Sequence, residues 1–582
     1  MKNCNKELLN QFDKDSDPEK QNKRFTTNTA TTSDSFQKPT PSPIYNNKNL
    51  INNIFVRNSI RFFINNTFIN GFNDRNACYK VGDIIPMGLT NDEPKELCRM
   101  DMYGEVANVP CFYSCKEKDI QSKDLQVLLR DYVVKATFEI FSTLLSVRNP
   151  DKTLKLQNNP DDKKPVQCTR GIYIPEELYT KGKNDTDHYV FITARPTQDS
   201  MTIAFSLICD APILYIGTNE WIYDRPRVSI LNFNPNYFSK ILESQSKWVF
   251  NQYMRVGIHE MVHSLGFSAL LYDSFVNPDT GIPYRFDSNQ IAKVIQEDGT
   301  TPLGRHFVRN KSVIATPTIV KFTKNYFNCS TAQGFELEDY GGAGTAGSHW
   351  EKRSADEEIM TGYISQTLPL SRLTLTFLYD TGWYIPNFSF SENHQWGKGL
   401  GCDWLKNCDP KSWDLPGYYC TNFREMDCTA NRMGKGICHL VRYTESLPAF
   451  YQHFNSTSIG GSNRASDYCP FYQTVHSVNC PKCGYCSNTE EKPNKAIKEE
   501  FGFDSRCFNY NIIYIANDTS SNSACWINRC NNERKILEVK IDENWYDCVV
   551  NKTIQVPIDV TEKETILLEL ICPKKEFDIC DF

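Results

Sequence analysis

The chain has 582 residues, and 64 lysines and arginines stand against 70 aspartates and glutamates, a formal net charge of −6. This balance lacks the basic excess with which proteins bind a phosphate backbone, so we expect no nucleic-acid partner. Hydrophobic residues make up 40% of the chain and aromatic residues 13%, which suffices for sizeable cores. The sequence contains no run of 18 or more apolar residues, so we expect no transmembrane helix.

The first half of the chain alternates between helical and strand-like patterns. Residues 1–50 are polar and lack hydrophobic periodicity, so we expect them to be disordered, with globular structure beginning at about residue 51. Apolar residues at helical spacing predict a helix over 123–146 and a longer one over about 237–265 that ends at Gly266. Runs of β-branched and aromatic residues predict strands at 189–193, 204–209, 213–217 and 228–232. Two helices flanking a sheet indicate an α/β layer.

The second half is less regular. Residues 267–348 follow no single period and contain turn clusters, which indicates a large insertion with some structure of its own. A helix is predicted at about 371–381, with Ser371 as its cap and Gly382 as its stop. Beyond residue 400 cysteines become dense, so we expect short strands and loops joined by disulfides.

One motif carries chemistry. Residues 256–268 read VGIHEMVHSLGFS, with His259, Glu260 and His263 at its centre. On a helix, positions i and i+4 share a face, so both imidazoles can bind one zinc ion. Glu260 then lies beside the metal-bound water, in the position of a general base. The alternative, two histidines on a packed or solvated face, is disfavoured because apolar flanks indicate burial, and buried histidines need partners.

A catalytic zinc site needs a third protein ligand. The compact pattern, in which Gly-x-x-His follows the second histidine, fails because Ala269 occupies the last position. Among the seven other histidines His349 fits best, since Met360 follows it by 11 residues and a methionine turn is the second mark of such sites. His306 is a weaker rival in a polar stretch.

These stretches resemble the leishmanolysin family of metzincin zinc endopeptidases. VGIHEMVHSLGFS and EDYGGAGTAGSHWEKRSADEEIM are similar to family segments, as are TFLYDTGWY, QWGKGLGCDWLKNC and SDYCPFYQ, together with the cysteine pattern. The family likewise has a long insertion before its third histidine. The resemblance covers about residues 51–575.

The resemblance implies an α/β (α+β) metzincin-type catalytic module split by a large insertion and followed by a disulfide-rich, mostly β and loop domain. It implies one Zn²⁺ per chain on His259, His263 and His349, with Glu260 catalytic and Met360 in the methionine turn. The expected parts are a disordered segment 1–50, a catalytic subdomain 51–268 that ends in the HEMVH helix, a central subdomain 269–400 and a Cys-rich domain 401–582. Protein or peptide substrates follow, hydrolysed by a zinc-activated water with Glu260 as general base and acid.

The cysteines predict an oxidising compartment. Fifteen of the 23 lie after residue 400, and eight Asn-x-Ser/Thr sequons agree with an extracellular, secretory or vacuolar glycoprotein. An odd count leaves at least one thiol unpaired, and Cys4 is the obvious candidate. The N-terminus lacks the apolar core of a signal peptide, so we expect another export route or a missing start. A reduced cytosolic protein remains the alternative.

Two features of the family are not visible in this sequence. No pro-segment with a latency cysteine is visible before residue 51, and the tail EFDICDF lacks a lipid-anchor signal. We therefore carry over neither autoinhibition nor an anchor, although peripheral association with a membrane stays compatible with the sequence.

Three further patterns receive structural interpretations. Gly342-x-Gly344-x-x-Gly347 matches a dinucleotide fingerprint but lacks the preceding apolar strand, so we interpret the glycines as a tight turn. Cys480, Cys483 and Cys486 lack the continuation of an iron–sulfur motif and are expected in disulfides. The acidic run 356–358 is interpreted as solvated charge.

Three functions remain in competition. The first is an active zinc endopeptidase. The second is an inactive adhesion or recognition protein on the same scaffold, which loss of a ligand or of Glu260 would have favoured. The third is an intracellular processing peptidase, supported by the missing signal peptide alone.

Overall fold

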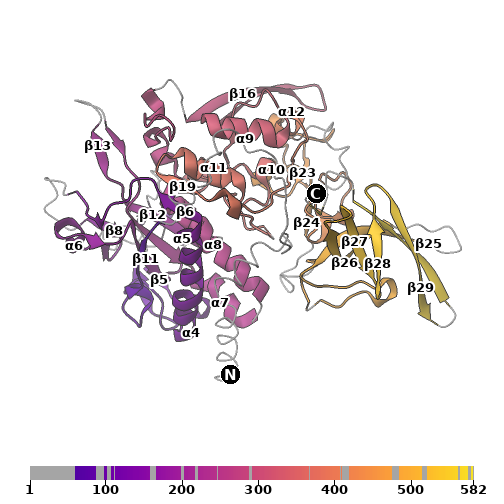
Figure 1. The fold of residues 1–582 in the computed structure, drawn as a ribbon, viewed down its shortest axis with the longest axis horizontal. Coiled ribbons are helices and arrows are strands. Elements are labelled where there is room, and N and C mark those ends of the chain that lie inside the picture. The colour runs from indigo at the N-terminus through magenta and orange to yellow at the C-terminus, as the bar shows by residue number, and fades with distance from the viewer. Residues whose placement is uncertain are drawn as a thin grey trace.

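A computed structural model describes most of the chain from residue 59 onward (Figure 1). The predicted disorder of residues 1–50, and the interpretation of Cys4, lie outside the described residues. The described residues are 59–86, 98–100, 107–109, 112–157, 166–197, 202–215, 221–244, 247–286, 291–365, 367–406, 408, 418–474, 484–489, 491–513, 521–561, 564–573 and 579–580.

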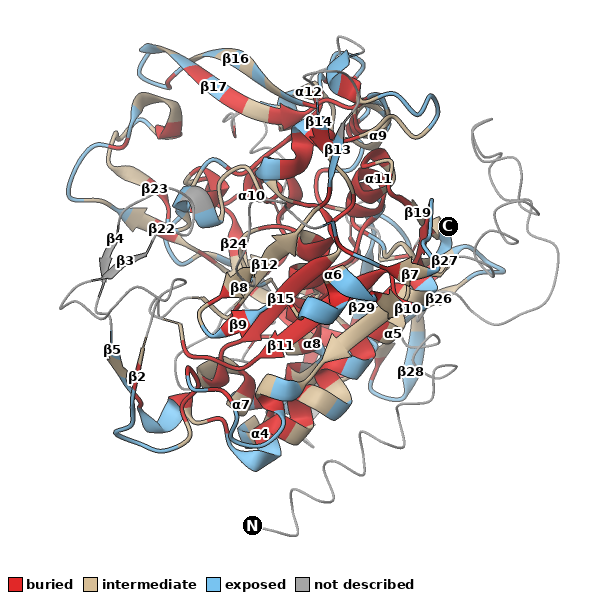
Figure 2. Cartoon of the chain, turned by 90° about the vertical axis from the view of Figure 1, so that its left-hand side faces the viewer, coloured by how far each residue is buried: buried red, intermediate tan, exposed pale blue. Residues whose placement is uncertain are grey.

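A four-stranded sheet forms the centre of the N-terminal part. Its order is β1 (Phe62–Asn65), β11 (His188–Thr193), β15 (Val228–Phe233) and β12 (Ala204–Asp210). The first three strands run parallel, and β12 is antiparallel at the edge. Figure 2 shows β11 and β15 buried along their whole length, as the runs of apolar residues predict. Of the predicted strands only 213–217 lies elsewhere, in a hairpin of β13 (Ile213–Tyr215) and β14 (Trp221–Tyr223).

Helices pack against this sheet. The helix predicted at 123–146 is confirmed as α4 (Lys123–Val127), a π-helical stretch η4 (Leu128–Val134) and α5 (Lys135–Leu144) in direct succession. The helix predicted over about 237–265 is described in two parts, α7 (Pro235–Ser244) and α8 (Lys247–Leu265), and residues 245 and 246 between them lie outside the described residues.

The central part joins a β-hairpin to helices. Strand β16 (Ala292–Thr300) pairs with β17 (His306–Ile314), which also pairs with β18 (Phe335–Glu336). Around them lie α9 (Pro317–Phe327), α10 (Lys352–Ala355) and α11 (Arg372–Asp380). The prediction for α11 is confirmed: the Ser371 side chain accepts from the Leu373 N–H, and Gly382 follows with a φ of 78°.

The C-terminal part is rich in β structure. Its six-stranded antiparallel sheet has the order β28 (Asn544–Cys548), β27 (Ile536–Ile541), β26 (Ser521–Asn531), β25 (Ser505–Ile513), β30 (Glu564–Ile571) and β29 (Thr553–Thr561). Figure 1 shows this sheet, in yellow, at the opposite end of the long axis from the indigo and magenta strands. The expectation of short strands alone is wrong here, because β25 and β26 span 9 and 11 residues. Trp526, Leu568 and Leu570 are among the buried residues of a separate apolar core.

Smaller elements complete the mixed α+β fold. They are β2 (Ile84–Pro86), β3 (Cys98–Met100), β4 (Ala107–Val109), β5 (Phe112–Ser114), β6 (Leu145–Val147), β7 (Thr153–Leu154), β8 (Gln167–Thr169), β9 (Ile172–Tyr173), α6 (Glu176–Thr180), β10 (Lys183–Asn184), β19 (Tyr384–Pro386), α12 (Cys402–Leu405), β20 (Met426–Cys428), β21 (Lys435–Cys438), β22 (Leu440–Arg442), β23 (Ile459–Gly461) and β24 (Tyr472–Thr474).

Disulfides connect these parts, as the cysteine density predicts. Cys486 pairs with Cys525, while Cys480 and Cys483 lie outside the described residues. The other bonds that the structure records are Cys78–Cys115, Cys168–Cys209, Cys329–Cys402, Cys408–Cys469, Cys420–Cys438, Cys428–Cys507, Cys530–Cys580 and Cys548–Cys572. Across the described part of the chain, no helix combines the length and the apolar character that a membrane span requires.

Candidate metal centre

Helix α8 holds the first three candidate residues. Its apolar side chains Ile258, Met261 and Val262 are buried, which fixes the face that presents His259 and His263. The helix ends at Gly266, whose φ of 138° few other residues adopt. The chain turns back there, so that the Phe267 carbonyl accepts a hydrogen bond from His263 Nδ1 at 2.8 Å.

A glycine-rich turn carries His349 to the same place. Gly341, Gly342 and Gly347 all have positive φ, which confirms a tight turn in place of a nucleotide-binding loop. The Gly347 N–H donates to the Glu338 carbonyl, and the Glu338 N–H donates to the His349 carbonyl. His349 Nδ1 donates to the Thr345 carbonyl at 2.9 Å, so the turn also orients the ring.

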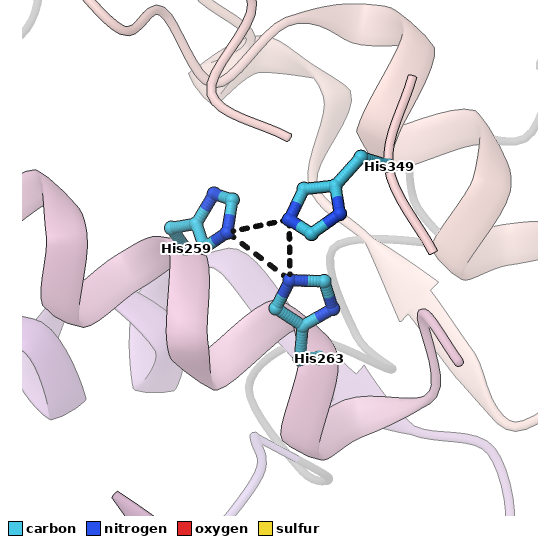
Figure 3. Close-up of side chains that lie close together, drawn as sticks. All are labelled: His259, His263 and His349. Atoms are coloured by element: carbon cyan, nitrogen blue, oxygen red, sulfur yellow. Dashed lines mark hydrogen bonds between the residues drawn. The ribbon is translucent and has the colours of Figure 1, made fainter. Parts of the chain in front are cut away.

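The three predicted histidines meet at one point (Figure 3). Their Nε2 atoms lie 3.1 Å from one another in all three pairs. The third Nδ1, that of His259, donates to the Ile359 carbonyl at 2.6 Å. Because every Nδ1 carries a proton toward a carbonyl, each Nε2 presents a lone pair, and three lone pairs face one another.

This donor set fits a zinc ion. Nitrogen ligands at about 2.0–2.1 Å from a tetrahedral zinc lie roughly 3.3 Å apart, close to the observed spacing. Burial lowers the pKa of His259 to about 4 and, with the nearby His259 ring, the pKa of His349 to about 3. Burial also lowers the pKa of His263 well below its ordinary value. The rings are therefore neutral at physiological pH, as metal ligands must be.

Glu260 lies on the same helix and faces the sheet. It is 6% exposed, and its carboxylate accepts a hydrogen bond from the backbone N–H of Ser206 on the edge strand β12. Burial raises its pKa to about 8, and the Ser206 hydrogen bond opposes that rise. A buried carboxyl beside three histidines is a candidate for proton transfer.

A large cavity opens over this centre. Its volume is about 1340 Å³, and Glu260, His259, His263 and His349 all line it. Strand β12 forms part of one wall, and the stretches 340–345 and 361–364 contribute to the lining. This volume exceeds the roughly 300–1,000 Å³ of typical small-molecule pockets, so the cavity can receive a larger ligand.

The acidic run 356–358 is not solvated, which corrects the prediction. Asp356 is 9% exposed and Glu358 is fully buried. The Glu358 carboxylate accepts from the Met360 N–H at 2.6 Å and from the Ser371 and Thr374 hydroxyls at 2.8 and 2.6 Å. Burial raises the pKa of Glu358 to about 7, and these hydrogen bonds oppose the rise. The run looked solvated because sequence spacing does not reveal the partners of Glu358, which are the Ser371 and Thr374 hydroxyls, or the Asn431 partner of Glu357.

The other histidines have different roles. His306, the rival third ligand, lies exposed on β17 beside Asp298. His188 and His394 are buried and hydrogen-bonded to the Pro226 and Ala355 carbonyls. His453 hydrogen-bonds the Asp467 carbonyl. His439 lies near Ser462, and His476 lies outside the described residues.

Comparison with known proteins identifies the family. A family model described as leishmanolysin matches residues 91–581. The chain belongs to the leishmanolysin family. This leishmanolysin-family chain is 30% identical over 466 residues to a leishmanolysin-like peptidase of Caenorhabditis elegans, covering 69% of the chain and 67% of the relative. The resemblance seen in the motifs is thereby confirmed, and the family is one of metallopeptidases.

Two further relatives agree. The leishmanolysin-family chain is 31% identical over 380 residues to a leishmanolysin-like peptidase of Drosophila melanogaster, covering 57% of the chain and 53% of the relative. It is 27% identical over 454 residues to a leishmanolysin homolog of Crithidia fasciculata, covering 76% of the chain and 62% of the relative. The chain therefore spans about half to two thirds of the length of these relatives.

Sequence reasoning missed three contributors to the centre of this leishmanolysin-family chain. Ser206 and Ile359 act through backbone atoms, so their side chains carry no signal. Glu358 was noticed only as part of a charge run. Its position two residues before Met360 was the available clue.

Proposed function

We propose that this chain is a zinc-dependent endopeptidase that hydrolyses peptide bonds in protein substrates. One Zn²⁺ would be held by His259, His263 and His349, in a metzincin-type module whose first two ligands and third ligand are separated by the insertion 267–348. The observation that carries the proposal is the meeting of three Nε2 lone pairs, each with its Nδ1 proton engaged by a carbonyl.

Glu260 would handle the proton. A zinc ion held here supplies Lewis acidity, which polarises the scissile carbonyl and makes water easier to deprotonate. The Glu260 carboxylate takes a proton from the attacking water and delivers it to the nitrogen of the leaving amine. The Ser206 N–H favours the ionised form of Glu260 and fixes its direction. Met360 would lie in the methionine turn; it is fully buried and its carbonyl accepts from the Trp350 N–H.

The edge strand suggests how substrate binds. Strand β12 has a sheet partner on one side, β15, and contributes residues 204–210 to the cavity lining. A free strand edge pairs with an extended peptide through main-chain hydrogen bonds. We therefore expect an extended stretch of polypeptide along β12, with its scissile bond beside Glu260.

An oxidising compartment fits the disulfides and the sequons. Disulfides at nine described pairs are compatible with an extracellular, secretory or vacuolar location. Exposed sequon asparagines among the described residues are Asn184, Asn310, Asn328, Asn455 and Asn551. The inactive adhesion protein is less well supported, because Glu260 and all three histidines are present.

The test compares a Glu260→Gln variant with the parent. We expect the variant to bind zinc and melt like the parent but to cleave casein about 100- to 10,000-fold more slowly, because proton transfer is lost. Glu543→Gln, in the exposed turn between β27 and β28, is the matched control and should cleave casein normally. Casein cleavage by purified Glu260→Gln at the parental rate would refute the role of Glu260, and failure of a chelator to stop the parent would refute zinc dependence.

A further inference from the structure

The buried carboxylate of Glu358 is unusual in its number of donors. It is fully buried, yet four donors surround it: the Met360 N–H, the Ser371 N–H and hydroxyl, and the Thr374 hydroxyl. Ser371 and Thr374 belong to the start of α11, where the helix dipole also favours a negative charge. Placing a carboxyl in such a position costs free energy unless every oxygen is satisfied, and here both oxygens are.

One set of contacts leads from Glu358 to His259. Glu358 Oε2 accepts from the Met360 N–H at 2.6 Å, and the Thr361 N–H donates to the Glu358 carbonyl. These two bonds close a tight turn with Ile359 at its centre. The Ile359 carbonyl then accepts from His259 Nδ1 at 2.6 Å. The carboxylate thus fixes the carbonyl that orients this ring.

A second set leads to His349. Glu358 Oε1 accepts from the Thr374 hydroxyl at 2.6 Å, and Thr374 Oγ1 accepts from Trp350 Nε1 at 3.0 Å. Trp350, the neighbour of His349, is fully buried, and its N–H donates to the Met360 carbonyl at 2.9 Å. The Trp350 backbone is therefore bonded to the turn that Glu358 holds, and its indole is bonded to Thr374, which itself donates to Glu358.

From these contacts we propose that Glu358 is a positioning residue. It holds helix α8 and the loop that bears His349 in the relative position at which the Nε2 atoms of His259 and His349 meet. The proposal rests on the function proposed above. His263 lies outside both routes, because its Nδ1 bonds to Phe267 immediately after its own helix. Glu358 therefore acts on the distance between two separate segments of chain, one bearing His259 and the other His349.

Zinc affinity measures this role directly. We compare Glu358→Gln with the parent by competition against a chromogenic zinc chelator. Glutamine keeps the size but cannot accept equally from all four donors, so we expect zinc affinity to fall about 10- to 100-fold, as loss of partners behind metal ligands does. With cobalt(II) at saturating concentration, the visible absorption of the variant should also differ in shape from that of the parent.

Glu357→Gln is the matched control. Glu357 is the adjacent glutamate, but its carboxylate bonds to Thr367 and Asn431, away from both routes. We expect its zinc affinity to stay within about twofold of the parent's, whatever its melting temperature. If Glu358→Gln lowered the melting temperature of the zinc-free protein while leaving zinc affinity and the cobalt spectrum unchanged, Glu358 would serve stability alone and the proposal would be overturned.

Should Glu358→Gln fail to fold, Thr374→Val tests the second route. Valine keeps the shape of threonine and removes the hydroxyl between Glu358 and Trp350, so we expect zinc affinity to fall about 3- to 10-fold; parental affinity would overturn the proposal. Failure of the proposed function would look different. In that case His259→Ala and His349→Ala would leave the zinc binding of the parent unchanged.

Discussion

Gly257 lies directly against Thr137. A Cβ added at position 257 would meet Thr137 Oγ1 at 2.6 Å, closer than side chains approach one another. Helix α8 therefore packs onto the helix over 123–144 at a separation that glycine permits. The contact is two residues before His259, so the backbone approach at Gly257 helps to set where the metal centre lies.

We predict that Gly257→Ala destabilises the protein. The added methyl group must displace Thr137 or tilt α8, and overpacking of this kind costs about 1–3 kcal/mol. That cost outweighs the roughly 1 kcal/mol by which alanine favours a helix over glycine. Urea unfolding should show a lower free energy of unfolding, and zinc affinity should fall as His259 moves.

The double variant Gly257→Ala/Thr137→Ala provides the control. Removing Oγ1 makes room for the methyl group, at the loss of the hydrogen bond from Thr137 to the Val133 carbonyl. We expect the two substitutions together to be less destabilising than the sum of the single ones. Strict additivity would show that the two residues do not compete for space.

Much of the local structure follows from the sequence. The spacing of His259 and His263, the stop at Gly266 and the cap at Ser371 are encoded within one or two helical turns, and the structure has them. His349 was predicted as the third ligand from Met360, which follows it by 11 residues. The helical spacing, the stop and the cap are local features, so pattern and turn chemistry suffice to predict them.

The features that sequence patterns missed depend on distant partners. Glu358 looked like solvated charge because its donors Ser371 and Thr374 become neighbours only in the folded chain. The six-stranded sheet was missed because the cysteines in 505–571 suggested loops. Cys507 and Cys525 in fact lie opposite each other on the neighbouring strands β25 and β26. Burial of charge and strand pairing are long-range properties, which a single sequence encodes weakly.

Zinc should raise the melting temperature of the chain. A ligand that binds the native state alone stabilises it by about 2.7 kcal/mol at a concentration 100-fold above its dissociation constant. Differential scanning fluorimetry should therefore show a melting temperature that rises when zinc is added and falls when a chelator is added. His349→Ala should largely abolish the response, while His306→Ala, on the exposed hairpin, should keep it. An equal response in both variants would contradict the assignment of His349.

The disulfide Cys428–Cys507 should be worth several kcal/mol. It joins β20 to β25 across a sequence separation of 79 residues, and both cysteines are buried. Crosslinks over loops of this size contribute about 2–5 kcal/mol. We expect Cys428→Ser/Cys507→Ser to lower the free energy of unfolding in urea by that amount. If the oxidised parent and the double variant unfolded at the same urea concentration, the disulfide would not make this contribution.

Asp467 should make the protein sensitive to acid. Burial disfavours its charge, but Arg309 and Arg353, which bond to it at 2.6 and 3.0 Å, outweigh burial and lower its pKa to about 2. The folded state thus binds this proton less readily than the unfolded state, whose ordinary value is 3.8. The resulting stability, about 2 kcal/mol, is present above pH 4 and is lost as the pH falls toward 2.

The variant Asp467→Asn isolates this contribution from those of other carboxylates. At pH 7 it should lower the free energy of unfolding by about 3–5 kcal/mol, because two buried guanidinium groups lose a shared partner. Between pH 4 and pH 2 its stability should fall less steeply than the parent's, since asparagine binds no proton. Asp542→Asn, at an exposed turn, should follow the parent throughout. If the free energy of unfolding fell equally in the parent and in Asp467→Asn, the acid sensitivity would lie at other carboxylates. Only a group whose pKa differs between the folded and the unfolded state makes stability depend on pH.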